Sequence, residues 1–446
     1  MRVLWICNIV LPVIAKKLGQ EVNNKEGWIS GLMDAVLAHN ESEQEKQIQL
    51  GIAFPIPKGQ ELLEDCLVVN QDYDIPFYGF REDVTAADWY DNGMEADFSY
   101  IFARFKPDVI HCFGTEYPHT LAAVKTFGRP ERSIIGIQGL CRVYAGCYMA
   151  NLPKAVQKSV TFRDWLKKDT LPKQQQKFEE RGQWELAAVK GTGHVIGRTH
   201  WDKYWTGKWN PRAKYHMMNE TLRKEFYIGQ WSIERCQPHR LFLSQGDYPI
   251  KGLHYMLLAL PQILKEYPDT RVYVAGNSIL RDKSLVGRLK ISAYGAYIER
   301  LIDKEGLGEH IHFAGKLNAA QMKEQYLACE AFVCPSSIEN SPNSLGEAMI
   351  LGVPVVTSDV GGICTMITPE EGILYEGFRT ESADREEELY DIAERLAKSV
   401  CQSFSDREAT LKKAAGAKVH ADKTHNGTAN NRRLIEIYEE LVTSSS

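Results

Sequence analysis

Short apolar runs alternate with amphipathic stretches along the first half of the chain. Five of these runs have the length and composition of strands: Arg2–Cys7, Ile48–Ala53, Val109–Phe113, Ser133–Ile137 and His194–Gly197. Between them lie stretches such as Gly27–Ala38 and Ala87–Phe105, whose apolar residues have helical spacing. Strands that alternate with helices form a mainly parallel sheet that is covered on both faces. The first half is therefore predicted to be an α/β domain.

The second half repeats this alternation more regularly. Its predicted strands are Arg240–Ser244, Arg271–Ala275, His312–Ala314, Ala331–Cys334 and Val355–Thr357. From Leu253 to Leu264, apolar residues recur at helical spacing and predict one buried helix face. Pro261 lies inside this stretch, so we expect a kinked or shortened helix. The two halves together predict two doubly wound, Rossmann-like domains, in which ligands bind at the carboxyl ends of the strands.

The length of the chain also favours two domains, because 446 residues exceed what one ordinary hydrophobic core accommodates. The polar, charged stretch Asn219–Pro238 is the predicted connection between them. We therefore expect an N-terminal domain over residues 1–222 and a C-terminal domain over residues 223–425. A last helix within residues 426–446 is expected to pack back on the first domain.

Composition narrows the functional classes. Hydrophobic residues make up 44 % and charged residues 25 %, as in a globular protein, and the net charge of −5 argues against a nucleic-acid binder that relies on bulk positive charge. The longest apolar runs are too short for a membrane span, and the N-terminus resembles a buried strand more than a signal peptide. We therefore expect a cytoplasmic protein. The ten cysteines form no C-x-x-C and no zinc-type cluster, so we expect them to be reduced.

The most informative segment runs from Val333 to Gly352. A predicted strand ends at Pro335, a short polar loop follows, and a helix is expected to begin near Ser341-Pro342. Serine is a preferred N-cap and proline is favoured at the first helical position, while Gly352 is expected to end the helix.

The start of this helix is suited to a diphosphate. The amides of Asn343, Ser344 and Leu345 are expected to have no partner within the helix and to face outward at the positive end of its dipole. In the preceding loop, Glu339 can accept hydrogen bonds from sugar hydroxyls. One turn inside the helix, Glu347 can hold the two hydroxyls of a ribose. The alternative is that these are a solvated loop acid and a helix-surface acid.

The spacing Glu339–x7–Glu347 resembles the signature of family 4 of the retaining GT-B glycosyltransferases. It stands within Pro-Ser-Ser-Ile-Glu, Glu-Ala-Met and Gly-Val-Pro-Val-Val, and Pro249–Leu253, Val274–Gly276 and Ile311–Leu317 extend the likeness. The resemblance implies a GT-B architecture, with two Rossmann-like domains that face a cleft. It also implies that the first glutamate contacts the donor sugar, the helix start binds the diphosphate and the second glutamate binds the ribose. Asn340 and Ser341, in the same loop, are included in the predicted donor site.

The resemblance also singles out Lys251, because the family carries a lysine that faces the donor phosphates after the first strand of this domain. The alternative for Lys251 is a solvated loop lysine. The sequence departs from the family five residues earlier, where Gly246 replaces a common arginine. A second cation must then come from elsewhere or be missing, and Arg198, at the end of a predicted first-domain strand, is the candidate substitute.

The first domain resembles the family more weakly, through Pro107–His111 and Met217–Glu220. Gly27 occupies the place of a glycine-containing loop that approaches the donor phosphate. Where family members often carry a histidine beside the reacting sugar, this chain has Gln138, which can hydrogen-bond a hydroxyl but cannot act as a base. His111 is an alternative base, although a histidine at a strand end is more often structural.

Two aromatic patterns have simpler explanations beside the functional ones. Trp201, Trp205 and Trp209 recur every four residues, and we expect them to pack in the core rather than to stack on a sugar. Residues 154–190 carry nine Lys and Arg against five Asp and Glu, with aromatic residues interleaved at Phe162, Trp165 and Trp184. This segment is expected to form solvated helices. The alternative is a peripheral contact with an anionic membrane surface.

The sequence thus predicts transfer of a hexose-type sugar from a nucleotide diphosphate sugar to a carbohydrate or lipid-linked hydroxyl acceptor. Glu339, Lys251 and Gln138 are the predicted catalytic residues. Retention of configuration and a role in bacterial polysaccharide or glycolipid assembly follow from the resemblance alone. No metal and no cofactor besides the nucleotide sugar are expected, since no aspartate-rich motif is present. The alternatives are an epimerase or hydrolase of the same fold, or a non-catalytic protein that binds nucleotide sugars.

Overall fold

The computed structural model describes residues 1–21, 27–42, 47–70, 73–277, 279–280, 289–379 and 386–443. The chain forms two compact units, which are described separately below. Unit 1 comprises Met1–Val143, Lys177–Thr221 and His425–Ser446, and unit 2 comprises Tyr144–Gln176 and Leu222–Thr424. The boundaries expected after residues 222 and 425 each lie within one residue of a change between units. Residues 144–176 differ from the expectation, since they belong to unit 2 although the sequence placed them in the first domain.

Unit 1 is built on an eight-stranded sheet of order β3-β4-β2-β1-β5-β6-β7-β8. Its strands are β1 (Arg2–Ile6), β2 (Gln49–Ile56), β3 (Leu63–Val68), β4 (Asp74–Arg81), β5 (Val109–Phe113), β6 (Ser133–Gly136), β7 (His194–Gly197) and β8 (Lys214–Met217). All neighbours pair in parallel except β3 with β4. The edge strand β3 has no fully buried residue, so no apolar run marks it in the sequence.

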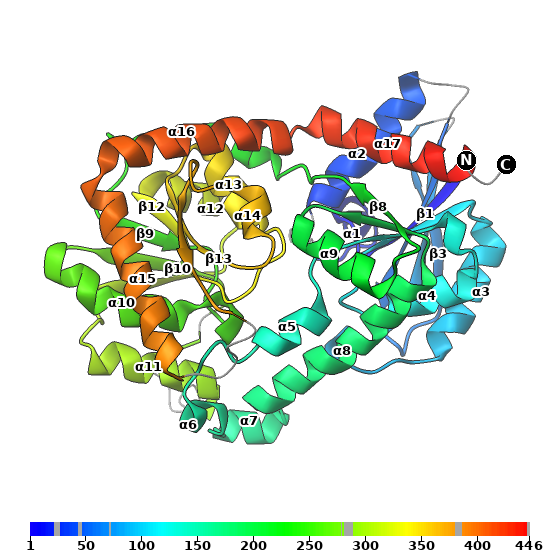
Figure 1. Cartoon of the computed structure of the whole chain (residues 1–446). Helices are drawn as coiled ribbons and strands as arrows, with labels where there is room; N and C mark the ends of the chain where they lie inside the picture. Colours follow the sequence, from blue (N-terminus) through cyan, green and yellow to red (C-terminus); the bar gives the residue numbers. More distant parts are fainter. Residues whose placement is uncertain are drawn as a thin grey trace. The chain divides into compact units, whose positions relative to one another are not determined.

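Helices cover both faces of this sheet, as Figure 1 shows for α2 and α17 on one side and α3 and α4 on the other. The first layer consists of α1 (Pro12–Lys17), α2 (Gly27–Ser42) and α17 (Gly427–Thr443). The second contains α3 (Gly93–Phe105), α4 (His119–Phe127) and α9 (His200–Trp209). Trp201, Trp205 and Trp209 of α9 pack against the core of this second layer, which favours the packing interpretation over a sugar-stacking platform.

Unit 2 is built on an all-parallel sheet of order β11-β10-β9-β12-β13-β14. Its strands are β9 (Arg240–Leu243), β10 (Arg271–Ala275), β11 (Ile311–Gly315), β12 (Ala331–Cys334), β13 (Val355–Asp359) and β14 (Ile373–Glu376). The helices α10 (Leu253–Glu266), α11 (Ala293–Lys304) and α15 (Glu386–Ser405) pack together. Residues of α12 (Ala319–Ala328), α13 (Asn343–Leu351) and α16 (Arg407–Thr424) contribute to a separate core. Figure 1 shows the ribbons of these three helices.

Pro261 does not shorten its helix, because α10 runs through it to Glu266. The proline removes one backbone hydrogen bond, but eight buried side chains hold this helix against its neighbours.

In each sheet, the strands that follow the first strand in the sequence are added first on one side of it and later on the other, so the strand order reverses at one point. In unit 1 this point lies between β1 and β5, and in unit 2 between β9 and β12. In doubly wound sheets the ligand crevice forms at the carboxyl ends of these strands. In unit 2, the loop that follows β9 carries Lys251 and the loop that follows β12 carries Glu339.

Candidate functional site

Lys251 and Glu339 meet at the point in unit 2 where the strand order reverses. Lys251 ends the short helix η5 (Pro249–Lys251), and its Nζ lies 2.6 Å from Glu339 Oε1. The same carboxylate oxygen accepts a 2.8 Å hydrogen bond from Ser336 Oγ. Their side chains are 18 % and 8 % exposed respectively, so Lys251 is not the solvated loop lysine of the alternative. The sequence prediction brought these two residues into one site, and the structure places them in direct contact.

Lys251 remains positively charged in this environment. Burial alone would lower the pKa of its ammonium group, but the Glu339 carboxylate and the phenols of Tyr248 and Tyr144 raise that pKa well above its ordinary value. The Tyr248 ring also lies 5.8 Å from Nζ, within the range of a cation–π contact. The site therefore holds one buried cation beside one buried carboxylate.

Two glycines fix the loop that carries Glu339. Gly252 has φ +72°, and a Cβ there would collide with the carbonyl oxygen of Pro335. Gly361 has φ +58°, and a Cβ there would collide with the carbonyl oxygen of Glu339. That oxygen also accepts a 2.9 Å hydrogen bond from the amide of Gly362. Both positions require glycine, since only glycine combines a left-handed conformation with so close an approach of another backbone.

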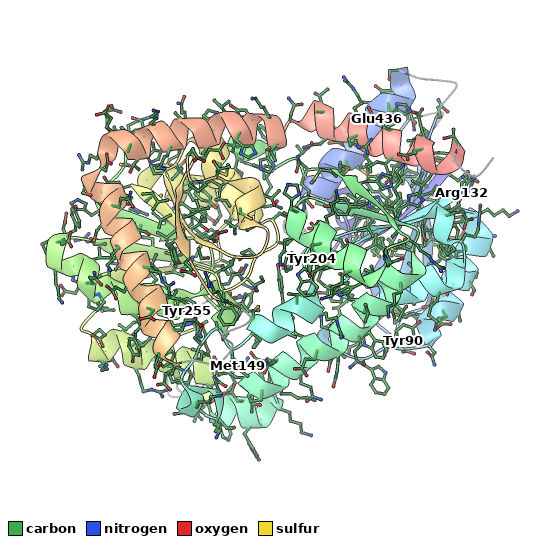
Figure 2. All side chains as sticks on the ribbon, viewed as in Figure 1. Tyr90, Arg132, Met149, Tyr204, Tyr255 and Glu436 are labelled. Carbon is green, nitrogen blue, oxygen red and sulfur yellow. The ribbon has the colours of Figure 1, made fainter. Side chains whose placement is uncertain are left out.

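Tyr144 is a residue of this site that the sequence analysis missed. Its hydroxyl accepts a 3.0 Å hydrogen bond from the amide of Asn340, next to Glu339. The segment that begins with Tyr144 is held on unit 2 by further bonds: Tyr255, labelled in Figure 2, donates to the carbonyl oxygen of Ala150 at 2.9 Å. Ser337 Oγ donates to the carbonyl oxygen of Cys147 at 3.3 Å. These long-range bonds explain why residues 144–176 belong to unit 2 and not to the first domain.

Helix α13 begins at Asn343, one residue later than predicted, with Pro342 as its N-cap. Ser341 is therefore not the N-cap, and its buried hydroxyl has no hydrogen-bond partner within the described residues. The amide of Leu345 is not free as predicted, because it donates to the carbonyl oxygen of Pro342 at 3.0 Å and closes the first turn. The amide of Ser344 has no partner in the described part of the chain. The start of the helix thus keeps an unpaired amide and an unpaired hydroxyl.

The end of α13 agrees with the prediction, since Gly352 caps it with φ +78°. Glu347 is 3 % exposed, which excludes the helix-surface alternative. Its Oε1 accepts hydrogen bonds from Arg223 Nε at 2.9 Å and Arg223 Nη2 at 2.6 Å. Burial raises the pKa of Glu347 to about 7, although Arg223 acts in the opposite direction. No local pattern in the sequence indicates this arginine as a partner.

The departure from the family at Gly246 has a steric explanation. A Cβ at this position would lie 2.9 Å from Val274 Cγ1 and 3.0 Å from Leu253 Cδ2. The first atoms of an arginine side chain would therefore press on packed core groups, which would have to shift to accommodate it.

Arg198, the candidate substitute for the missing arginine, already forms an ion pair within unit 1. It is buried, and its Nη1 lies 2.5 Å from Glu220 Oε2 in unit 1. Its Nη2 also donates to Gln138 Oε1 at 3.1 Å, while Gln138 Nε2 donates to Glu220 Oε1 at 2.8 Å. Glu220 thus neutralises the charge that the sequence analysis assigned to the donor.

Two further residues of unit 1 were singled out. Gly27 is the first residue of α2, in agreement with the predicted helix start. His111 is 1 % exposed, and its Nδ1 lies 2.7 Å from the hydroxyl of Tyr438. Burial lowers the pKa of His111 to about 3, so its proton affinity is too low for a base at neutral pH. His111 is therefore a structural residue, which leaves the base unassigned.

We also searched the described residues for metal ligands, disulfide bonds and membrane-spanning helices. No cluster of three or more His, Cys, Asp or Glu side chains that could hold a metal ion occurs among the described residues. None of the ten cysteines forms a disulfide bond. Within the described ranges, no helix is both long and apolar enough to cross a bilayer.

The two Rossmann-like units define a fold class, that of the GT-B glycosyltransferases. The chain is similar to sucrose-phosphate synthase from Thermosynechococcus elongatus, with a TM-score of 0.67 at 13 % identity over 100 % of both chains. It is also similar to Anabaena Alr3699/HepE solved with UDP-glucose, with a TM-score of 0.61 at 13 % identity over 99 % of this chain and 100 % of the other. At these identities the likeness concerns the fold alone.

Residues 233–399 match the family model of the glycosyl transferases group 1. This match covers less than half of the chain and lies within unit 2, so the likeness to the group 1 glycosyltransferases is a likeness of that unit. Among its relatives, the D-inositol 3-phosphate glycosyltransferase of Corynebacterium urealyticum is 24 % identical over 202 residues, which are 44 % of this chain and 41 % of the relative. The chain spans less than half the length of this relative.

Proposed function

We propose that this chain is a glycosyltransferase that moves a hexose-type sugar from a nucleotide diphosphate sugar to a hydroxyl of a carbohydrate or lipid-linked acceptor. In this proposal unit 2 binds the donor and unit 1 binds the acceptor. The observation that carries it is the Lys251–Glu339 pair, which stands beside the unpaired polar groups at the start of α13. The match of residues 233–399 to the family model of the glycosyl transferases group 1 supports the same conclusion.

The donor diphosphate is proposed to bind between Lys251 and the start of α13. Its oxygens can accept hydrogen bonds from the Lys251 ammonium, the Ser344 amide and the Ser341 hydroxyl, and the helix dipole favours negative charge at this end. Asn340 directly precedes Ser341 in the sequence, and Asn343 directly precedes Ser344. The amide of Leu345, which is bonded to Pro342, contributes only by closing the first turn. No metal ion is needed in this scheme, because a cation and a helix start supply the positive field.

Lys251 and Glu339 are proposed to exchange partners when the donor arrives. In the ligand-free pair each group satisfies the other at 2.6 Å. A diphosphate is the stronger anion and draws the ammonium toward itself. Glu339 then accepts hydrogen bonds from hydroxyls of the donor sugar and orients it. Glu347 similarly receives the ribose hydroxyls. In this scheme Glu339 binds the donor sugar and Glu347 binds the ribose, and each buried charge keeps a partner.

During transfer, the bond between the sugar's anomeric carbon and the diphosphate breaks, and a bond to the acceptor oxygen forms. Charge grows on the diphosphate, where Lys251 and the Ser344 amide are positioned to stabilise it. Gln138 is proposed to contact the sugar without taking the proton, since an amide is not a base. The leaving diphosphate oxygen is the proposed proton acceptor. We also propose that the configuration at the anomeric carbon is retained and that Gly27 contacts the donor. Both statements rest on the family resemblance.

A product assay separates the proposal from its alternatives. An epimerase or hydrolase would turn over UDP-glucose or GDP-mannose without an acceptor, and a non-catalytic protein would bind one of them without turnover across a broad acceptor panel.

A Glu339→Gln variant should lose about tenfold or more of the transfer rate while its affinity for UDP stays within about threefold of the parent's. The exposed acid Glu376 supplies the control, as Glu376→Gln. Undiminished transfer by Glu339→Gln would falsify the role of Glu339.

One exposed surface of the protein is relevant to its acceptor and to its location in the cell. We propose a cytoplasmic enzyme in polysaccharide or glycolipid assembly that contacts anionic membranes peripherally. The supporting feature lies in residues 154–168, where apolar side chains are exposed beside exposed lysines: Val160, Phe162, Trp165, Leu166, Lys154, Lys158, Lys167 and Lys168. Trp184 does not contribute, because it packs on the core of unit 1 and its Nε1 donates to the carbonyl oxygen of Asp88.

A further inference from the structure

The carboxylate of Glu347 is held asymmetrically. Both hydrogen bonds from Arg223, at 2.9 Å from Nε and 2.6 Å from Nη2, end on Oε1. The other oxygen, Oε2, is contacted by the hydroxyl of Tyr326 at 3.5 Å. One oxygen of this buried acid is therefore saturated by a single arginine, while the other has only a marginal contact.

Tyr326 cannot satisfy Oε2, because a phenol has only one proton to donate. The same hydroxyl lies 2.9 Å from the carbonyl oxygen of Ser344, which is the shorter and stronger of its two contacts. When the proton points to Ser344, the lone pairs of Glu347 Oε2 have no donor among the described residues. A buried carboxylate oxygen that lacks a donor is costly unless a ligand supplies one.

Arg223 is itself fixed before any ligand binds. Its guanidinium group lies 4.8 Å from the ring centroid of Phe226, a residue that is completely buried. Phe226 packs edge-on against Tyr326 at 5.9 Å between centroids. Arg223, Phe226 and Tyr326 thus form one rigid support behind Glu347. The arginine presents its donors with little further loss of side-chain entropy.

The charges around Glu347 come from two elements. Arg223 is the N-cap of η4 (Lys224–Tyr227), Glu225 lies within η4, and Tyr326 lies on α12. Burial raises the pKa of the Glu347 carboxyl, the contacts with Arg223 and Tyr326 lower it, and Glu225 raises it further, with a net value of about 7. Arg223 is the only cation in this group, so its loss would leave the carboxyl protonated at neutral pH.

We propose that Arg223 is a positioning residue of the donor site, which holds Glu347 by Oε1 and thereby presents Oε2 as an ionised acceptor to the two hydroxyls of the donor's ribose. This inference rests on the proposed function, because it presupposes that Glu347 receives the ribose. It adds a residue whose action is indirect, since Arg223 touches the carboxylate and not the nucleotide. Its loss should therefore change the pH dependence of donor binding as well as the affinity.

The test compares the affinity for UDP-glucose and for GDP-mannose by calorimetry at several values between about pH 6 and pH 8.5. Nucleotide sugars are used instead of UDP because a terminal phosphate titrates near pH 6 itself. Arg223→Met should weaken binding about tenfold or more at pH 7, and the loss should shrink at pH 8.5 as Glu347 ionises. Arg223→Lys restores a positive charge and should keep the parent's pH profile with a loss of about threefold or less.

Two controls separate positioning from a general structural role. Arg395→Met removes another partly buried arginine of unit 2, 32 % exposed and 3.0 Å from Glu376, and should bind like the parent. In a Glu347→Gln background the side chain at position 347 cannot titrate. Adding Arg223→Met there should cause little further loss of affinity and no new pH dependence. Each variant is checked for unchanged thermal unfolding and circular dichroism, and Arg223→Lys carries the test if Arg223→Met does not fold.

The possible outcomes have distinct meanings. Parallel pH profiles of Arg223→Met and the parent, or fully additive losses in the Glu347→Gln background, would overturn the inference about Arg223 alone. Binding that is unaffected by Glu347→Gln would overturn the ribose role of Glu347. A parent protein that binds neither nucleotide sugar would overturn the proposed function itself, and the inference with it.

Discussion

Replacing Lys251 by methionine tests the site through two effects that can be measured separately. The substitution keeps an unbranched side chain that is one atom shorter, and it removes the ammonium that lies 2.6 Å from Glu339 Oε1. Removing one partner of a buried ion pair costs about 3–5 kcal/mol, and the partial exposure of Lys251 favours the lower end. A domain of this size loses roughly 2–4 °C in Tm for each kcal/mol, so Tm should fall by several degrees.

The second effect is on the donor. A charge-assisted hydrogen bond contributes about 1.5–3 kcal/mol, so Lys251→Met should weaken binding of UDP-glucose or GDP-mannose by roughly 10-fold to 150-fold. Adding Glu339→Gln removes the carboxylate left unpaired and should restore much of the stability without restoring the affinity. Lys304, whose side chain is 74 % exposed, supplies the control Lys304→Met, for which neither quantity should change. Calorimetric titration combined with thermal unfolding measures both. An affinity of Lys251→Met within about twofold of the parent's would refute the assignment of Lys251 to the diphosphate.

Two further predictions concern other parts of the chain. Glu185 is buried in unit 1, where burial raises its pKa to about 8, against an ordinary value of 4.5. Because the folded state then binds more protons than the unfolded state between these values, the free energy of unfolding should fall as the pH rises through this window, by up to about 1.4 kcal/mol per pH unit. Glu185→Gln should flatten the dependence in urea unfolding, and a slope equal to the parent's would contradict it. The exposed patch in residues 154–168 should bind vesicles of phosphatidylcholine with about one-third phosphatidylglycerol at low salt. Trp165→Ser should reduce flotation several-fold, whereas Trp89→Ser, which removes an equally exposed tryptophan (68 % against 67 %), should not; absence of parent binding would end this idea.

The sequence predicted the central strands because they are buried on both faces. β1 and β5 form continuous apolar runs for that reason, and both were located to within a residue. β3 lies at the edge of its sheet with no fully buried residue, so its pattern resembles a loop. The domain boundary near residue 222 follows a local change in polarity. The membership of residues 144–176 depends instead on bonds such as Tyr255 to Ala150, which no local pattern encodes.

The candidate site shows the same division. Glu339, Glu347 and Lys251 could be found because their spacing is local or resembles a family signature. Tyr144 and Arg223 lie 196 and 124 residues from their partners in the chain, so only the folded structure brings them to Asn340 and Glu347. The ion pair between Arg198 and Glu220 could not be predicted for the same reason, because Glu220 follows a different strand of the sheet.

A crystal structure of the protein with UDP-glucose tests the donor site most directly. Our account predicts the diphosphate within hydrogen-bond distance of Lys251 Nζ and the Ser344 amide, with the ribose hydroxyls on Glu347 Oε2. It also predicts that the Lys251–Glu339 bond opens as Glu339 turns to the sugar. A nucleotide bound elsewhere, with that ion pair intact and the start of α13 unoccupied at saturating ligand, would contradict it.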